Sequence, residues 1–244
     1  VMKTLDFPNL QSVVKKESYK VNWKSLDDKG WSLSDEKESK LLDKIKKAGI
    51  PLGEYVDGKI YRGVVTGYNP AFIIDEETKN TLIKKYKNSK EIIFPFVSGD
   101  ETRHYLINWN KRYIIFTKRG IDIEKYPAVK EYLFDFKNFL QPKKNPSDKH
   151  GRKPGKYKWY EIQDSTEYFS KFFNDKIVYG QFQIKCDFAF SSESLFFGSN
   201  HYMILHENLL DLKFVLSILN SKVFFYYMER TTGLMQGNTL TIQK

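Results

Sequence analysis

The residue types of a metal-dependent nuclease occur in the first third of the chain. Asp57 and Glu77 supply two carboxylates that would hold Mg²⁺, and Lys79 supplies an amine that would orient the attacking water. The Glu-x-Lys step falls in a predicted helix rather than on a strand beside Asp57, and such steps are common in a lysine-rich chain. A solvated helix face is therefore the favoured interpretation, and the nuclease is kept as an alternative.

Other catalytic patterns are incomplete. Asn69-Pro70-Ala71-Phe72 is similar to the Asn-Pro-Pro-aromatic motif with which amino-methyltransferases hold the amine of a flipped base. Ala71 replaces the second proline, however, and no glycine-rich turn for S-adenosylmethionine lies upstream. The chain has no Gly-x-Ser-x-Gly elbow and no Gly-Lys-Ser/Thr phosphate loop, and its four histidines are too scattered for a metal site. We therefore predict no catalytic residue, metal or cofactor in this chain.

Positive charge is concentrated in one segment. The chain carries 40 Lys and Arg against 30 Asp and Glu, a net charge of +10. Residues 141–160 hold seven cations against a single acid, Asp148. The cations are Lys143, Lys144, Lys149, Arg152, Lys153, Lys156 and Lys158. Tyr157, Trp159 and Tyr160 are interleaved with them, and prolines and glycines make the segment a loop. This pattern predicts phosphate contacts. The alternatives are a solvated loop that is basic by chance, and a lysine content that reflects an AT-rich genome.

The composition restricts the class of protein. Hydrophobic residues make up 41% of the chain, enough for a core. One cysteine, Cys186, excludes a disulfide framework. No apolar run approaches the length of a membrane span, and no signal peptide pattern opens the chain. A reducing, cytoplasmic location without a membrane is the expectation.

The elements that would position these residues follow from apolar spacing. Ser34 can cap a helix whose stripe is Leu41, Leu42, Ile45 and Ala48, and Trp23 and Trp31 are isolated apolar anchors before it. Strands are predicted at 60–66, 71–74, 91–97, 105–107, 112–117, 177–179, 182–190 and 202–206. Further helices are predicted at 75–86, 127–140, 165–173 and 211–230. Because helices and strands do not alternate regularly, the fold class is α+β: a mixed, mostly antiparallel sheet flanked by helices, with an N-terminal helical arm and a long C-terminal helix.

Five segments, in order, resemble a known family. They are residues 61–72 (YRGVVTGYNPAF), 126–133 (YPAVKEYL), 155–162 (GKYKWYEI), 176–179 (KIVY) and 216–222 (LSILNSK). They look like the RG-x-x-TG-x-N-x-A-F, YPA-x-K-x-YL, GK-x-x-WYE, KI-V/I-x and LL-x-x-LNS-K motifs of the C-terminal target-recognition domains of Type IIG restriction–modification enzymes and TaqI-like adenine methyltransferases. The family usually continues beyond the last helix, so we expect part of the recognition unit to be missing after Lys244.

The resemblance implies sequence-specific recognition of double-stranded DNA. Residues 1–58 are then an arm or linker from an absent upstream domain, and 59–244 the recognition domain. Methyltransferase and nuclease domains outside the chain would supply the chemistry, with S-adenosylmethionine and Mg²⁺. The expected DNA-binding residues are Arg62, Thr66, Tyr68, Asn69, Lys118, Arg119, His150 and Tyr157, together with the seven cations of 141–160. Trp159 and Tyr160 are equally consistent with core anchors. The alternative from another class is a protein-interaction module, with an exposed aromatic patch and little dependence of binding on salt.

Overall fold

The computed structural model describes residues 9–18, 36–99, 101–145, 147–164, 167–232, 234–235 and 239–242. The chain divides into two units, Val1–Pro51 and Leu52–Lys244. The first contains helices α1 (Leu10–Glu17) and α2 (Glu36–Ala48). The predicted stripe lies on α2, whereas Ser34, Trp23 and Trp31 lie outside the described residues. The origin of this unit in an upstream domain stays a prediction.

The second unit is built on an antiparallel sheet in the order β1-β11-β7-β9. Its strands are β1 (Ile60–Arg62), β11 (His201–Ile204), β7 (Lys176–Gly180) and β9 (Phe188–Ser191). Every residue of β7 and β11 is buried. Because successive side chains of a strand point to opposite faces, this pattern requires that both faces of the sheet are covered.

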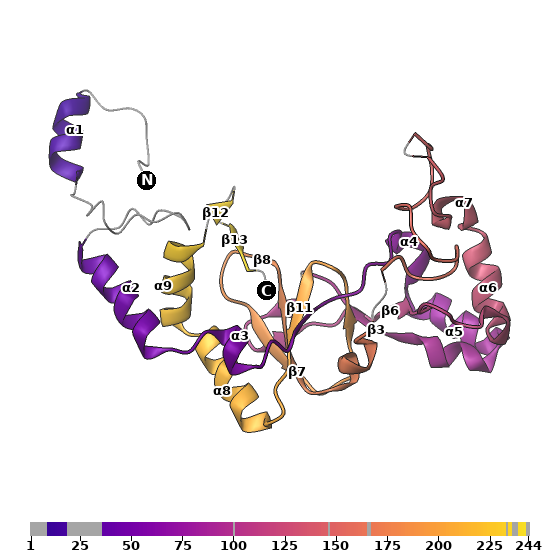
Figure 1. Ribbon diagram of the computed structural model, residues 1–244. Helices are drawn as coiled ribbons and strands as arrows, with labels where there is room; N and C mark the ends of the chain where they lie inside the picture. The colour runs from indigo at the N-terminus through magenta and orange to yellow at the C-terminus, as the bar shows by residue number, and fades with distance from the viewer. Residues whose placement is uncertain are drawn as a thin grey trace. The chain divides into compact units, whose positions relative to one another are not determined.

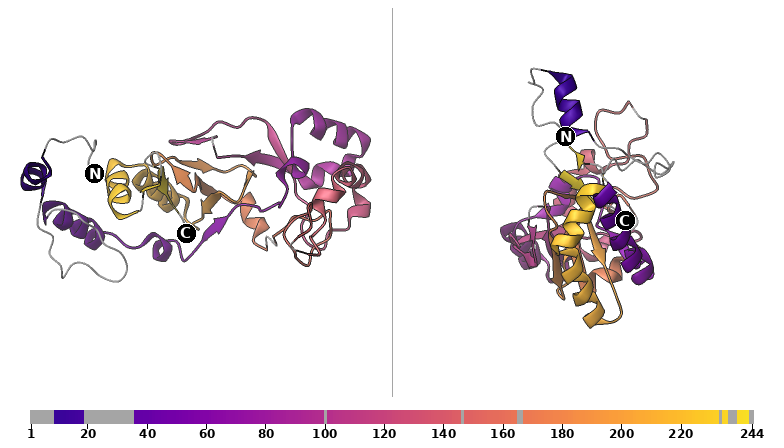
Figure 2. Two further views of the ribbon diagram at one scale, coloured as in Figure 1. Left: turned by 90° about the horizontal axis from the view of Figure 1, so that it is seen from above. Right: turned by 90° about the vertical axis from the view of Figure 1, so that its left-hand side faces the viewer.

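Two hydrophobic cores cover those faces. Ile177 and Tyr179 of β7 belong to the core that includes helix α8 (Leu209–Leu219). Val178, between them, belongs to the core of a second sheet. In Figures 1 and 2 the strands of the first sheet lie between α8 and the helices of the second sheet.

The second sheet has the order β10-β3-β6-β2, in which only the β10–β3 pair is parallel. Its strands are β10 (Phe196–Phe197), β3 (Ile93–Val97), β6 (Arg112–Ile115) and β2 (Ile73–Ile74). Helices α5 (Glu76–Lys85) and α6 (Pro127–Phe134) contribute Leu82, Val129 and Leu133 to its core. Both α+β architecture and mostly antiparallel pairing are therefore confirmed.

The smaller elements complete the unit. They are α3 (Leu52–Tyr55), α4 (Asn69–Phe72), α7 (Lys137–Leu140), α9 (Lys222–Thr231), β4 (Thr102–Arg103), β5 (Leu106–Ile107), β8 (Phe182–Gln183), β12 (Leu234–Met235), β13 (Thr239–Thr241) and 3-10 turns at Lys87–Ile92, Ile123–Lys125 and Phe169–Phe173. Strands β12, β13 and β8 form a small sheet, and β4 pairs with β5. Among the described residues, no helix is long and apolar enough to cross a membrane.

Several predicted boundaries are wrong in detail. Residues 71–72, predicted as strand, end the one-turn helix α4, because Pro70 suits a first helical turn. The helix predicted at 127–140 is two helices, α6 and α7, and the strand predicted at 182–190 is β8 and β9. Of the helix predicted at 165–173, the structure has a 3-10 turn at Phe169–Phe173, and residues 165 and 166 lie outside the described residues.

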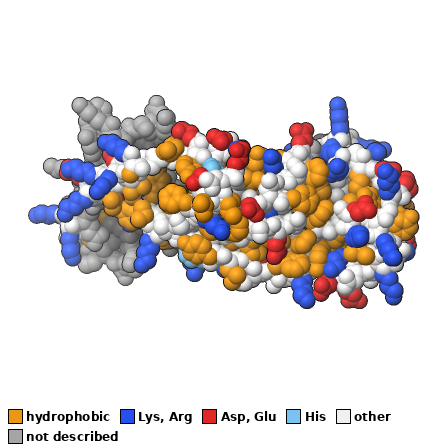
Figure 3. Space-filling view, turned by 90° about the horizontal axis from the view of Figure 1, so that it is seen from below, with side chains coloured by type: hydrophobic (Ala, Val, Ile, Leu, Met, Phe, Trp, Pro, Cys, Tyr) orange, Lys and Arg blue, Asp and Glu red, His pale blue; other side chains and the backbone are white. Residues whose placement is uncertain are grey.

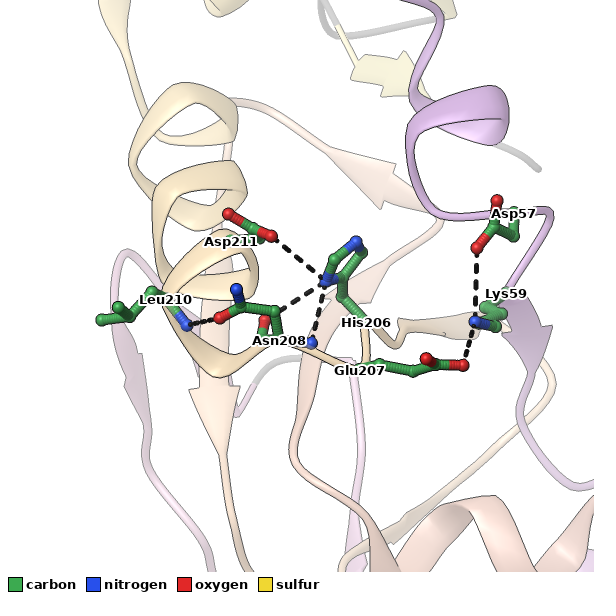
Figure 4. Close-up of polar contacts among 7 residues, drawn as sticks. All are labelled: Asp57, Lys59, His206, Glu207, Asn208, Leu210 and Asp211. Carbon is green, nitrogen blue, oxygen red and sulfur yellow. Dashed lines mark hydrogen bonds and ion pairs between the residues drawn. The ribbon is translucent and has the colours of Figure 1, made fainter.

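Polar contacts join the residues just before β1 to the residues just after β11 (Figure 4). Lys59 Nζ lies 2.8 Å from Glu207 Oε1 and 3.4 Å from Asp57 Oδ2. The backbone N–H of Leu205 donates to the Lys59 carbonyl at 3.0 Å. The two carboxylates are exposed and Lys59 is half-buried, so these ion pairs contribute little to stability, and the backbone bond fixes the alignment.

The predicted C-terminal helix is divided by Asn220 and Ser221. The Asn220 Oδ1 accepts from the backbone N–H of Phe188 at 3.1 Å, and its Nδ2 donates to the Phe188 carbonyl at 2.8 Å. Ser221 Oγ then accepts from the N–H of Phe224 at 3.1 Å and caps α9. The LNS motif thus clamps α8 to strand β9 and starts the next helix.

We expect Asn220→Ala to lower the free energy of unfolding by about 1–3 kcal/mol, because the backbone N–H of Phe188 loses its acceptor and the Phe188 carbonyl keeps only the N–H of Tyr105. Urea denaturation measures this change. Ser217→Ala, an exposed position on the same helix, is the matched control and should change stability by about 0.5 kcal/mol or less. Equal stability of the two variants would contradict the clamp.

Lys176 is a charged residue in the interior of the sheet. Its Nζ donates to the carbonyls of Glu193, Phe172 and Asn174 at 2.6, 2.8 and 3.0 Å. Burial lowers the pKa of Lys176 to about 8 from 10.5, because the ammonium leaves water. The lysine of the KI motif therefore closes the turn before β7.

Between about pH 8 and 10.5 the unfolded chain binds a proton at Lys176 that the folded chain has released. The contribution of Lys176 to the free energy of unfolding therefore rises with pH in that window, by at most about 1.4 kcal/mol per pH unit. We expect the free energy of unfolding of the wild type, measured from pH 8 to 10, to rise relative to that of Lys176→Met. Parallel pH profiles would show that Lys176 keeps its ordinary pKa.

Candidate nucleic-acid interface

The basic segment 141–160 is organised around one buried guanidinium. Arg152 is 3% exposed. Its Nε donates to the Leu140 carbonyl at 2.7 Å, and its two terminal nitrogens donate to the carbonyls of Thr66, Glu161 and Trp159 at 2.7, 2.8 and 3.0 Å, with Lys158 at 3.5 Å. Four of these carbonyls lie outside helices and strands, and the fifth, that of Leu140, lies at the end of α7. Desolvation lowers the pKa of Arg152 to about 10, so it stays charged at neutral pH.

A second layer of side chains surrounds Arg152. The ring of Tyr157 lies 4.5 Å from the guanidinium carbon of Arg152 and 4.9 Å from that of Arg119. Arg119 also donates to the carbonyls of Lys156 and Gln163. The buried Glu161 accepts from the backbone N–H groups of Gly120 and Lys158, each at 2.9 Å. We name these four residues, Arg119, Arg152, Tyr157 and Glu161, the arginine clamp.

The clamp leaves the lysine side chains on the surface. Lys144, Lys149, Lys153, Lys156 and Lys158 are exposed, and Lys143 is half-buried. Asp148, the acid of the segment, accepts from the backbone N–H groups of Lys144 and Asn145 at 2.9 and 3.0 Å, and these bonds hold its pKa below the usual value. The segment therefore combines a hydrogen-bonded backbone with exposed cationic side chains, a combination that suits phosphate contacts.

The turn 66–70 is fixed by the clamp on one side. Gly67 has a φ of +78°, and a Cβ there would lie 2.7 Å from Arg152 Cδ, so this position requires glycine. Thr66 Oγ1 donates to Asn69 Oδ1 at 2.6 Å, which closes the turn into α4. Tyr68 stacks on Phe139 of α7, with ring centroids 5.2 Å apart.

The predicted DNA-binding residues fall into two groups, one bonded within the protein and one at the surface. Arg152, Tyr157 and Thr66 are buried, and Arg119 donates to backbone carbonyls. The polar groups of these four residues already form hydrogen bonds within the protein, and their contact with DNA stays a prediction. Trp159 and Tyr160 pack against the core as anchors.

The other predicted residues lie at the surface. They are Arg62, Tyr68, Asn69, Lys118, His150 and the lysines of the basic segment. Arg62 Nε donates to the Ser199 carbonyl at 2.6 Å, and Lys118 lies over the ring of Phe169. His150 makes an edge contact with Phe139, which also stacks on Tyr68. The basic segment and the turn 66–70 thus form one surface.

The three residues of the nuclease alternative belong to different parts of the unit. Asp57 follows Val56, which packs in the core with α8, whereas Glu77 lies on α5, which packs in the other core. Lys79 lies over the Tyr113 ring and 3.8 Å from Glu76. The described residues contain no group of three His, Cys, Asp or Glu that could hold a metal ion. This arrangement gives the nuclease alternative no support.

Comparison with known families identifies the chain. The model of the TaqI-like C-terminal specificity domain matches residues 94–243, more than half of the sequence. The chain belongs to this family of restriction–modification specificity domains. No curated protein matches it.

Two solved structures are similar. One is the Type IIL restriction–modification enzyme MmeI in complex with DNA, with a TM-score of 0.51 and 15% identity over 76% of this chain and 23% of that chain. The other is the Type IIG restriction endonuclease BpuSI, with a TM-score of 0.48 and 13% identity over 85% of this chain and 24% of that chain. The match to MmeI shows a shared fold. The chain spans about a quarter of the length of each enzyme.

The arginine clamp predicts a large difference between adjacent cations. Arg152→Met should lower the free energy of unfolding by about 3 kcal/mol, because buried carbonyls lose their donors. Lys153→Met, at the exposed neighbouring position, should change it by about 0.5 kcal/mol or less. Arg152→Lys should recover only part of the loss, since an ammonium cannot reproduce the planar fork. Urea denaturation checks all three, and similar losses for the two methionine variants would exclude the clamp.

Proposed function

We propose that this chain binds double-stranded DNA and reads its sequence as the specificity domain of a restriction–modification enzyme. In that enzyme it would hold the duplex while companion domains, outside this chain, flip and methylate an adenine and, in an enzyme that also cuts, cleave the DNA. S-adenosylmethionine and Mg²⁺ would belong to those domains. The DNA-bound state of MmeI, which shares the fold, supports this proposal.

The observation that carries the proposal is the set of exposed lysines on a backbone fixed by the arginine clamp. Lysines that neutralise phosphates give affinity and orientation without reading bases. A rigid backbone beneath them limits the conformational entropy that is lost on binding. Family membership and this surface both support DNA binding, since a specificity domain must hold DNA in a fixed register.

One observation favours the alternative, a protein-interaction surface. Leu210, Phe214 and Ile218 form a stripe along α8 and are 75%, 57% and 46% exposed. Hydrophobic side chains gather over α8 and α9 in the view from below (Figure 3). Association through this stripe would depend little on salt, whereas DNA binding through lysines depends strongly on it. The two surfaces can therefore be tested separately.

Replacement of Lys144, Lys149 and Lys153 by alanine should weaken binding to every duplex. The slope of log K against log salt should become less steep by about 0.9 for each lost phosphate contact, roughly 3 for the triple variant. Fluorescence anisotropy with a labelled duplex at four or more salt concentrations measures the slope.

The matched control removes the same charge elsewhere. Lys84, Lys87 and Lys90 are exposed on and after α5. Their triple alanine variant should keep the wild-type salt slope. A second control, Phe214→Ser, should leave DNA binding unchanged. If both lysine variants lose affinity equally, the attraction comes from net charge and the basic segment has no special role.

A further inference from the structure

We infer that a cleft beside the turn 66–70 is the base-reading site, and that Asn69 and Asn200 contact base edges in the major groove. The inference rests on the proposed function and assigns the specificity that the lysines cannot supply. The cleft has a volume of about 470 Å³. Its polar lining comes from four separate segments and includes Asn69, Ser98, Arg112, Ser199, Asn200 and His201.

The wall that carries Asn200 is a rigid turn between β10 and β11. The N–H of Gln181 donates to the Asn200 carbonyl at 2.7 Å, and the N–H of Gly63 donates to the His201 carbonyl at 2.9 Å. A Cβ at Gly63 would lie 2.1 Å from the Gly198 oxygen, so glycine is required for this close approach of two backbones. The exposed Asn200 side chain therefore projects from a backbone that is fixed before DNA arrives.

The opposite wall is electrically balanced. Glu101 is buried, accepts from the N–H of Ser98 at 2.6 Å and pairs with Arg112 at 3.0 Å. The guanidinium of Arg112 is therefore neutralised by a carboxylate in contact with it. A site for phosphate would need uncompensated positive charge, as the basic segment has. A neutral cleft with amide and hydroxyl groups instead suits the donors and acceptors of base edges.

The cleft and the basic segment share the turn 66–70. Arg152 donates to the Thr66 carbonyl and faces Gly67, whereas Asn69 and Pro70 line the cleft. DNA held by the lysines on one side of this turn would thus present its groove to the cleft on the other side. The geometry matches the division of work in which phosphate contacts position the duplex and base contacts specify it.

The chemistry of the two asparagines points to adenine. A carboxamide can accept from the N6 amine of adenine and donate to N7 in one plane. The Oδ1 of Asn69 already accepts from Thr66 at 2.6 Å, which orients the amide, and a carbonyl oxygen retains a second lone pair. The expected site therefore contains at least one adenine whose major-groove edge is read by an asparagine.

Selection from a random duplex pool tests the assignment, with the full chain as wild type, Asn200→Ala, Asn69→Asp and Asn88→Ala. Asn69→Asp keeps an acceptor for Thr66 but removes the amide donors. Asn88 is exposed outside the cleft lining and serves as the matched control. Each cleft variant should lose roughly 5- to 150-fold of its preference for adenine at one position, with an unchanged salt slope. The control should enrich the wild-type motif.

The outcomes separate this inference from the function on which it rests. A wild-type motif that survives intact in both cleft variants would overturn the base-reading site and leave the DNA-binding function standing. A wild-type chain that enriches no motif would overturn sequence-specific recognition itself. Thermal melting followed by circular dichroism accompanies each variant. If Asn69→Asp unfolds, the result with Asn200→Ala decides.

Discussion

The burial of the Arg152 guanidinium is the constraint on which the candidate interface depends. The described residues of 141–162 contain no regular helix or strand, so few of their carbonyls have the partners that a ladder would provide. A buried guanidinium, in turn, needs acceptors for all its donors. Each requirement satisfies the other, because the donors of Arg152 bind carbonyls from residues 66, 140, 158, 159 and 161. The lysines, the turn 66–70 and the cleft beside it take their positions from this arrangement.

Buried polar side chains bind backbone groups in the same way at three other places in the domain. Lys176 binds three carbonyls before β7, Glu101 holds the loop after β3, and Asn220 clamps α8 to β9. Lys176, Asn220 and Glu161 are polar positions of the family motifs, and each is buried. These motif positions therefore belong to the framework of the domain. Of the surface residues proposed to touch DNA, Lys144 and Asn200 lie outside the motifs, whereas Asn69 and Lys156 lie within them. A framework fixed in this way tolerates changes at the surface without loss of the fold.

Apolar spacing is sufficient to predict α2, and β-branched and aromatic content predicts most strands of the two larger sheets, but β10 is missed. Apolar spacing does not predict an element boundary that a single residue sets. Asn220 bonds to β9 and divides the expected C-terminal helix. Pro70 starts a helical turn where a strand is expected. Composition marks the basic segment but does not distinguish the buried Arg152 from the exposed lysines around it. The one sequence signal for burial at position 152 is that the residue is an arginine. Its planar fork of donors suits several fixed acceptors better than the ammonium of a lysine does. The cleft could not be predicted, because it joins residues 69, 98, 112 and 200.

The two proposed sites differ in electrostatics, and that difference has a physical reason. Phosphate attraction acts over about 10 Å at moderate salt and needs no exact geometry, so long lysine side chains on the surface serve it well. Base reading depends on hydrogen bonds at about 3 Å and gains from rigid, uncharged groups that phosphates do not occupy. Neutralisation of Arg112 by the buried Glu101 keeps the cleft available for bases while the lysines take the backbone. Because Gly67 and Asn69 belong to one turn, the arginine clamp that orders the lysines also sets the position of the cleft.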